Sequence, residues 1–186
     1  AAQRAEAEAN RGKKCSFNAW GNLAVLQCFL GQDEALTSID RGVLCDEGEV
    51  RPRLVRCLVH LSRAARGPDP QDEFELAYED ALSADSFANH RSPVALRLRP
   101  LCPLGLGRPE SAARAAHQAL QLNGAPVTNH LILAQALARQ GKTAWARFHQ
   151  LLARQTWPEA LLQPGRYTLT AHEGELWFES AEVLLG

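Results

Sequence analysis

Cysteine and histidine are the residues of this chain that would most readily support catalysis or metal binding. Cys57 and His60 stand three residues apart in a segment with helical periodicity, so their side chains share one face of the predicted helix. Such a pair suits a thiolate–imidazole couple or two ligands of a metal ion. No third partner is evident nearby in the sequence, and Cys57 occupies an apolar position. We therefore interpret Cys57 as a core residue.

The remaining chemical motifs are weak. The six histidines have no H-E-x-x-H or comparable spacing. Gly105-x-Gly107 lacks the strand context and the third glycine of a dinucleotide-binding loop. Arg97-Leu98-Arg99 is too short a basic run to indicate nucleic-acid binding, and the formal net charge of −1 gives no general attraction to it. The sequence predicts no enzyme, no cofactor or metal ion, and no nucleic-acid partner.

Composition indicates what kind of fold must position these residues. The chain has 186 residues, of which 46% are hydrophobic and 22% charged, values typical of one soluble globular domain. Alanine and leucine are abundant and aromatic residues make up only 6%, which favours packed helices over a sheet sandwich. No apolar run approaches the roughly 20 residues that a membrane-spanning helix needs, so no span is predicted.

The five cysteines bear on the cellular compartment. They have no C-x-x-C spacing, and we expect them to be reduced and structural in a cytoplasmic protein. The alternative is a periplasmic protein with one or two disulfides after removal of a signal peptide. The large excess of Arg over Lys indicates a GC-rich genome and hence a bacterial source.

The best-formed segment covers residues 16–48. Apolar residues recur there at three- and four-residue steps on both sides of Gly31, which predicts two short helices folded back on each other. Trp20 is expected in the core of this hairpin. Three further hairpins are predicted around Gly67, Gly107 and Gly141, so the turn glycines are separated by 36, 40 and 34 residues. This period is typical of helical solenoids, whose units bury their apolar faces by stacking.

With these features the sequence resembles the tetratricopeptide repeat (TPR) family. Helix A of that repeat has an aromatic residue, then Leu and Gly or Ala, then a turn Gly, and helix B has small residues at fixed steps. The first repeat matches with Trp20, Leu23, Ala24, Gly31, Ala35 and Ile39, and the fourth with Leu133, Ala134, Leu137, Gly141, Ala144 and Phe148. The resemblance implies an all-α fold, an α-solenoid of about four TPR-like hairpins with a short irregular or β-like C-terminal tail.

The repeats depart from the family pattern in two places. Arg99 and Pro100 occupy the Leu-Gly positions of the third repeat, and Pro100 and Pro103 should kink or end that helix. The family's carboxylate clamp needs Lys and Asn where this chain has Gly21 and Val25, so binding of chaperone C-terminal tails is not expected. In the fourth repeat, Trp145, Phe148 and Leu151 continue the inward-packing pattern. We expect Trp145 and Phe148, together with Trp157, to close the end of the solenoid, and the alternative is that these three form an exposed aromatic patch.

We divide the chain into a leading helix or cap at 1–15, a repeat domain at 16–155 and a tail at 156–186. The tail alternates in a way that predicts two short strands around Glu173-Gly174, with a closing helix at the end as the alternative. We expect it to cap the last repeat. It would otherwise offer an edge strand for docking, anchored by Tyr167, Leu169, Leu176 and Trp177.

The resemblance also indicates where a partner would bind, because helix A of each repeat lines the concave groove in this family. The groove positions with polar or charged side chains are Asn18, Asn22, Arg56, His60, Arg63, Arg97, Thr128, Gln135 and Arg139. Arg grips carboxylates and Asn pairs with peptide backbone, so we expect a protein or peptide segment with acidic residues. The implied function is a non-enzymatic scaffold, adaptor or chaperone.

Two other interpretations stay open. The arginines at 51–66 face a following segment rich in acidic residues, at 69–80, so these charges would pair with each other on the surface. In the second interpretation, the chain is an accessory structural subunit of a larger complex, such as a secretion or pilus assembly, and is bound through its convex face or its tail.

Overall fold

The periodic segments of the sequence form helices in the computed structural model, which describes residues 16–122, 126–156, 167–172 and 175–180. The helices are α2 (Phe17–Phe29), α3 (Glu34–Cys45), α4 (Val50–Arg66), α5 (Pro70–Phe87), α6 (Pro93–Leu98), α7 (Leu101–Gly105), α8 (Pro109–Gln121), α9 (Pro126–Arg139) and α10 (Thr143–Thr156). Two strands follow, β1 (Tyr167–His172) and β2 (Glu175–Ser180). The leading helix predicted within 1–15 lies outside the described residues.

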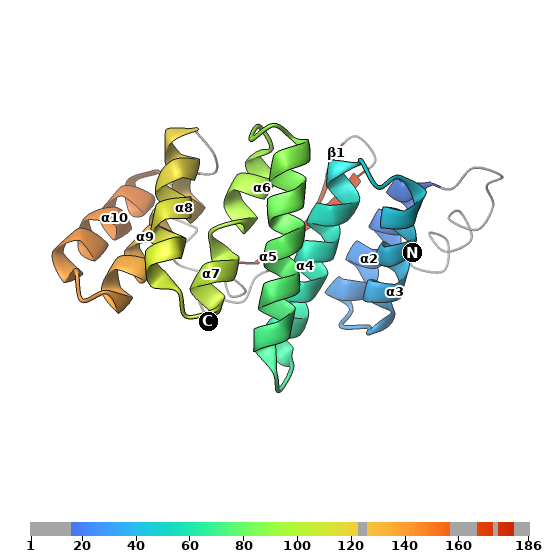
Figure 1. The fold of residues 1–186 in the computed structure, drawn as a ribbon, viewed down its shortest axis with the longest axis horizontal. Coiled ribbons are helices and arrows are strands. Elements are labelled where there is room, and N and C mark those ends of the chain that lie inside the picture. Colours follow the sequence, from blue (N-terminus) through green and yellow to red (C-terminus); the bar gives the residue numbers. More distant parts are fainter. Residues whose placement is uncertain (1–15, 123–125, 157–166, 173–174, 181–186) are drawn as a thin grey trace.

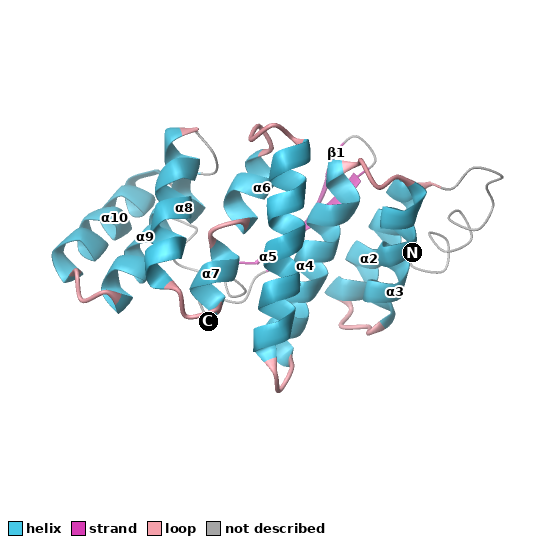
Figure 2. Cartoon of the chain, in the orientation of Figure 1, coloured by secondary structure: helices cyan, strands magenta, loops and turns pink. Residues whose placement is uncertain are grey.

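Helices that follow each other in the sequence pack side by side. The closest pairs are α2 with α3, α4 with α5, α8 with α9, and α9 with α10. Figures 1 and 2 show the result, an elongated row of helices that runs from α2 and α3 at one end to α9 and α10 at the other. The predicted all-α solenoid of helical hairpins is confirmed. Within the part of the chain that the structure describes, no helix is both long and apolar enough to cross a membrane.

Glycine sets the turns between helices. Gly31, Gly107 and Gly141 have φ values of +72°, +67° and +75°, the left-handed conformation that a Cβ disfavours. Each follows a helix and reverses the chain into the next one, as the glycine spacing predicted. Gly67 is different, because its φ is −83° and the chain instead turns through the proline-rich segment before α5.

The first helix of the third hairpin is broken, as its prolines predicted. The chain forms α6, then a short turn, then α7, with Pro100 in the turn and Pro103 inside α7. Ser92 caps α6 by accepting a hydrogen bond from the backbone N–H of Ala95 at 3.3 Å. Both prolines are fully buried, so the break is part of the packed core.

One continuous core joins all four hairpins. It includes Ile39 from the first, Val55 from the second and Ile132 from the fourth, each with no exposed surface. Trp20 is buried, as expected, in a small adjoining cluster with Leu23. Leu44, near the end of α3, lies outside this core and is 74% exposed.

The helix α7, which follows the break at Pro100, packs closely against α5, and this contact can be tested by substitution. A Cβ added to Gly105 at the end of α7 would overlap the ring of Phe74 on α5. We expect Gly105→Ala to destabilise the protein by about 1–3 kcal/mol, the usual range for overpacking. Urea denaturation measures this change. In a Phe74→Ala background the same substitution should cost much less, and an equal cost in both backgrounds would contradict the contact.

The C-terminal strands form an antiparallel hairpin in which Tyr167 lies opposite Ser180 and His172 opposite Glu175. This agrees with the two strands expected around residues 173 and 174. Their position differs from the prediction, because β2 lies beside α2 in the first hairpin. Figure 1 shows the strands behind α4, far from α10. The prediction that the tail caps the last repeat is therefore wrong for these two strands, and their backbones return to the start of the array.

Candidate functional site

The asparagines of the predicted groove surround a buried arginine. Arg51, on the first turn of α4, is only 5% exposed and reaches back to α2. Its guanidinium donates to the side-chain oxygens of Asn18 at 3.3 Å and of Asn22 at 2.6 Å. A Cβ on Gly21 would overlap that guanidinium, so the glycine leaves room for it. Asn18 and Asn22 thus join α2 to α4 within the chain.

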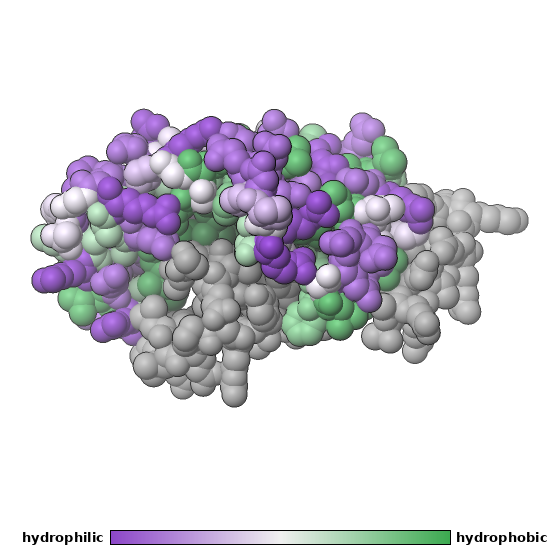
Figure 3. Space-filling model, turned by 90° about the horizontal axis from the view of Figure 1, so that it is seen from below, coloured by the Kyte–Doolittle hydropathy of each residue, from purple (hydrophilic) through white to green (hydrophobic). Residues whose placement is uncertain are grey.

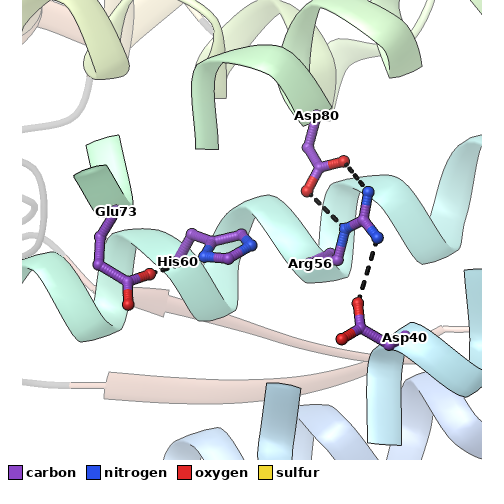
Figure 4. Close-up of polar contacts among 5 residues, drawn as sticks. All are labelled: Asp40, Arg56, His60, Glu73 and Asp80. Atoms are coloured by element: carbon purple, nitrogen blue, oxygen red, sulfur yellow. Dashed lines mark hydrogen bonds and ion pairs between the residues drawn. The ribbon is translucent and has the colours of Figure 1, made fainter. Parts of the chain in front are cut away.

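A stripe of three basic side chains on α4 contacts acidic residues of the neighbouring helices. Arg56 donates two bonds to Asp80 of α5, at 2.8 and 2.7 Å, and one to Asp40 of α3 at 3.1 Å. One turn further, His60 Nδ1 lies 2.7 Å from a carboxylate oxygen of Glu73. Figure 4 shows Arg56 between the two aspartates and His60 turned toward Glu73. Arg63 donates to the other oxygen of Glu73 at 2.6 Å.

Burial makes these pairs more than surface neutralisation. Asp80 is 4% and His60 5% exposed. The hydrogen bonds that Arg56 donates to Asp80 raise the pKa of Arg56 above its ordinary value. Burial alone would raise the pKa of Glu73, but the bonds from His60 and Arg63 outweigh it and lower that pKa. Arg56 and Arg63 therefore pair with Asp80 and Glu73 within the chain, as the interpretation of internal charge pairing expected, and the Asp80 carboxylate does so below the surface.

These contacts correct the orientation assigned to Arg56, His60 and Arg63. The family mapping pointed them into an open groove, whereas their side chains contact α3 and α5. The physical reason is that Asp80 and Glu73 stand on the adjoining α5, where these largely buried carboxylates would be costly to leave unpaired. Whether this stripe also contacts a partner stays a prediction.

The other predicted site residues lie further along the row. Arg139, at the end of α9, donates to the backbone carbonyl of Leu104 at 2.7 Å, so it too joins two repeats. Thr128 and Gln135 are half-buried on α9, and Arg97 is half-buried on α6. The side-chain oxygen of Gln135 is buried, and no hydrogen-bond partner is found for it among the described residues. The nine residues are thus divided among several helices and not gathered in one cluster.

Cys57 and His60 do not form a catalytic couple. The Cys57 thiol is fully buried in the core and neighbours Cys102. Burial raises the pKa of this thiol well above its ordinary value, and Cys102 adds to the effect. His60 is bonded to Glu73 instead. No group of three or more His, Cys, Asp or Glu residues able to hold a metal ion occurs in the described ranges.

One cysteine departs from the reduced state that we expected. Cys45, at the end of α3, is disulfide-bonded. Cys28, Cys57 and Cys102 are free thiols with buried side chains. The expectation of reduced cysteines is therefore correct for these three and wrong for Cys45. Sequence reasoning missed the bond because no spacing rule pairs cysteines that are brought together by a fold.

Large apolar side chains of the fourth repeat are exposed on α10. Trp145 is 62%, Phe148 48% and Leu151 57% exposed. The rings of Trp145 and Phe148 meet edge to face, with centroids 6.1 Å apart. The inward side of α10 is formed instead by Ala146 and Ala153, which are buried. Figure 3 shows this end of the molecule with apolar atoms beside hydrophilic ones. The expectation that these side chains pack inward is wrong, and the exposure of Trp145 and Phe148 agrees with the alternative of an exposed aromatic patch. Trp157 lies outside the described residues.

A histidine pair joins α10 to α9 beside this surface. The Nδ1 atoms of His130 and His149 are 3.0 Å apart, so one nitrogen donates and the other accepts, and the rings are stacked with centroids 5.2 Å apart. Burial lowers the pKa of both rings, and the pKa of His149 is lowered further by His130 and His117. The contact requires at least one neutral ring, because two imidazolium groups would repel each other.

This pair predicts a pH dependence. The pKa values are lower in the folded state than the unfolded value of about 6.5, so the neutral rings stabilise the fold above that pH. The contribution is lost as pH falls from about 6.5 through the folded-state pKa values. We expect thermal unfolding to show a smaller loss of stability between pH 7.5 and 5.5 in a His130→Phe, His149→Leu variant than in the unmodified chain. Equal losses would contradict the prediction.

A comparison with known proteins finds a solved structure with a similar fold. No protein-family model matches the chain, and no curated protein matches it either. The chain is similar to the crystal structure of TTC0263, a thermophilic TPR protein of Thermus thermophilus. The two superpose with a TM-score of 0.70 at 22% sequence identity, over 85% of this chain and 80% of that one. At this identity the similarity speaks for the fold alone, and it agrees with the hairpins and turn glycines described above. The chain is thus a helical-repeat protein with the TPR-like fold that its sequence predicted.

Proposed function

We propose that this chain is a non-enzymatic protein–protein interaction module, a scaffold or adaptor that holds a partner on the outer face of α10. The observation that carries the proposal is the exposure of Trp145, Phe148 and Leu151 on one helix face. Large exposed apolar side chains that cluster mark interaction sites, and tryptophan is enriched among the residues that dominate binding energy. TPR-like folds generally serve such interactions.

The predicted groove is a less favourable binding site for a partner, because several of its polar residues already form hydrogen bonds within the chain. Asn18, Asn22, Arg56, Arg63 and Arg139 each bond to groups of their own chain. A partner that used them would have to replace those bonds. This favours attachment through an outer face, which is the route of an accessory structural subunit as well as of an adaptor.

The disulfide at Cys45 supports a further part of the proposal, an oxidising compartment such as the periplasm. Alkylation of free thiols before lysis, followed by peptide mass spectrometry, tests this in the native source. We expect Cys45 to escape alkylation unless a reductant is added. Complete alkylation without reductant would contradict it.

Quantitative capture tests the function itself. The purified chain serves as bait for proteins of its native source, beside a Trp145→Ala, Phe148→Ala variant and a matched Leu76→Ala, Leu82→Ala control. The control residues are exposed to a similar degree on α5, at 45% and 41%. We expect at least one protein to be captured by the unmodified chain and the control, and to be depleted on the α10 variant. Capture by all three baits to the same extent would contradict the proposal.

A further inference from the structure

Charge is divided unevenly along the solenoid. Between Glu110 and Glu159 the chain has no acidic residue, and in that interval it carries Arg114, Arg139, Lys142, Arg147 and Arg154. By contrast, α5 contains six acidic residues and no Lys or Arg. The last hairpin is therefore a basic end of the molecule, despite a formal net charge of −1 for the whole chain.

The basic side chains of α10 stand next to its exposed apolar residues. At 100° per residue, Leu151 and Phe148 lie opposite the buried Ala146 and Ala153, with Trp145 on one flank and Arg147 and Arg154 on the other. Arg147 and Arg154 are exposed. Neither forms an ion pair with an Asp or Glu of the described residues, whereas Arg56, Arg63, Arg99 and Arg108 all do.

The occupant of such a face is constrained by chemistry and by shape. An apolar stripe flanked by cations that form no ion pair within the described part of the chain matches an apolar stripe flanked by carboxylates. The stripe also lies on a cylindrical helix surface, and earlier helices of the array are covered by the helices that follow them. A partner helix packed by ridges into grooves would continue this arrangement.

From these observations we infer that the outer face of α10 binds an acidic amphipathic helix of a partner protein. The inference rests on the proposed function and specifies the class of partner. A second copy of this chain fits less well, although α5 also has an acidic outer face. Four of its six acidic residues, Glu73, Glu75, Asp80 and Asp85, are already in ion pairs with their own chain.

Fluorescence anisotropy with two labelled synthetic peptides tests the inference. One is an amphipathic helix with a leucine stripe flanked by Glu, and the other is identical except that Lys replaces each Glu. The full chain should bind the acidic peptide and not the basic one. Binding should weaken by roughly tenfold or more in the Trp145→Ala, Phe148→Ala variant and in an Arg147→Glu, Arg154→Glu variant.

Two matched controls address other faces. Leu76→Ala, Leu82→Ala on α5 and Arg114→Glu on α8 should bind like the unmodified chain, and circular dichroism should show all variants folded. Equal affinity for both peptides, no affinity for the acidic one, or α10 variants that bind normally would overturn the inference. So would self-association in sedimentation velocity that the α10 variants abolish, because the face would then belong to a second copy.

The outcome is separable from the proposed function. A natural partner that depends on Trp145 and Phe148 but contacts them through a segment that is not an acidic helix would leave the proposed function intact. It would overturn only the class of partner. Cross-linking mass spectrometry on the captured complex identifies the contacting segment.

Discussion

Replacing Arg56 by alanine is expected to lower the free energy of unfolding by about 3–5 kcal/mol, the usual cost of removing one partner of a buried ion pair. Asp80 is 4% exposed, so it would be left as an uncompensated buried carboxylate. Arg56 also bonds Asp40, so one side chain joins the first and second hairpins. Guanidinium chloride denaturation followed by circular dichroism measures the loss.

Two variants show whether this cost comes from the pair. Arg66→Ala removes an exposed arginine of the same helix, and a surface change of this kind should stay within about 0.5 kcal/mol. The double variant Arg56→Met, Asp80→Leu should recover most of the stability, because apolar residues replace both charges. If the double variant is as unstable as Arg56→Ala, the buried pair does not explain the loss.

The second large effect is expected from a substitution toward the family pattern. Arg99 stands where that pattern has leucine, and Arg99→Leu would ordinarily be expected to improve a repeat. Here Arg99 donates to Asp85 at 2.6 Å, and Asp85 is 1% exposed with its other oxygen buried and unbonded within the described chain. We expect Arg99→Leu to cost about 3–5 kcal/mol, because the buried Asp85 carboxylate would lose its arginine partner and keep only the exposed His90.

A cycle with Asp85→Leu isolates this interaction. The double variant Arg99→Leu, Asp85→Leu should be more stable than Arg99→Leu alone, with a coupling energy of about 0.5–3 kcal/mol. His90 also contacts Asp85 at 2.9 Å, so a His90→Ala variant serves as a control for the weaker, exposed partner. Additive effects of the two leucine substitutions would contradict the role assigned to Arg99.

The fold could be predicted although the third repeat departs from the family pattern, because glycine and proline mark the turns and the break. Gly31, Gly107 and Gly141 marked their turns because few other residues adopt a positive φ without strain. Pro100 marked the break because it cannot donate a helix hydrogen bond. These are local constraints, and they act in any fold. Arg99, in contrast, depends on the tertiary arrangement, because its guanidinium donates hydrogen bonds to Asp85 of α5 and to Gln118 of α8.

The candidate site was harder to predict because it depends on which faces other helices cover. A periodic pattern places Trp145 and Phe148 on an apolar stripe but does not tell whether anything packs against that stripe. Arg56 and Arg63 read equally well as groove residues or as internal partners of acids, and only the arrangement of α3, α4 and α5 distinguishes the two. Two signals for the α10 surface are present in the sequence: the clustered aromatic residues Trp145 and Phe148, and the interval without acidic residues between Glu110 and Glu159.

Site-specific photo-cross-linking in the native source shows whether partners bind the outer face of α10. A photoreactive phenylalanine analogue replaces Phe148 in one strain and the similarly exposed Leu76 of α5 in another. We expect a cross-linked protein partner from position 148 and none, or a different one, from position 76. A cross-linked partner from position 76 together with none from position 148 would show that the outer face of α10 is not the binding surface.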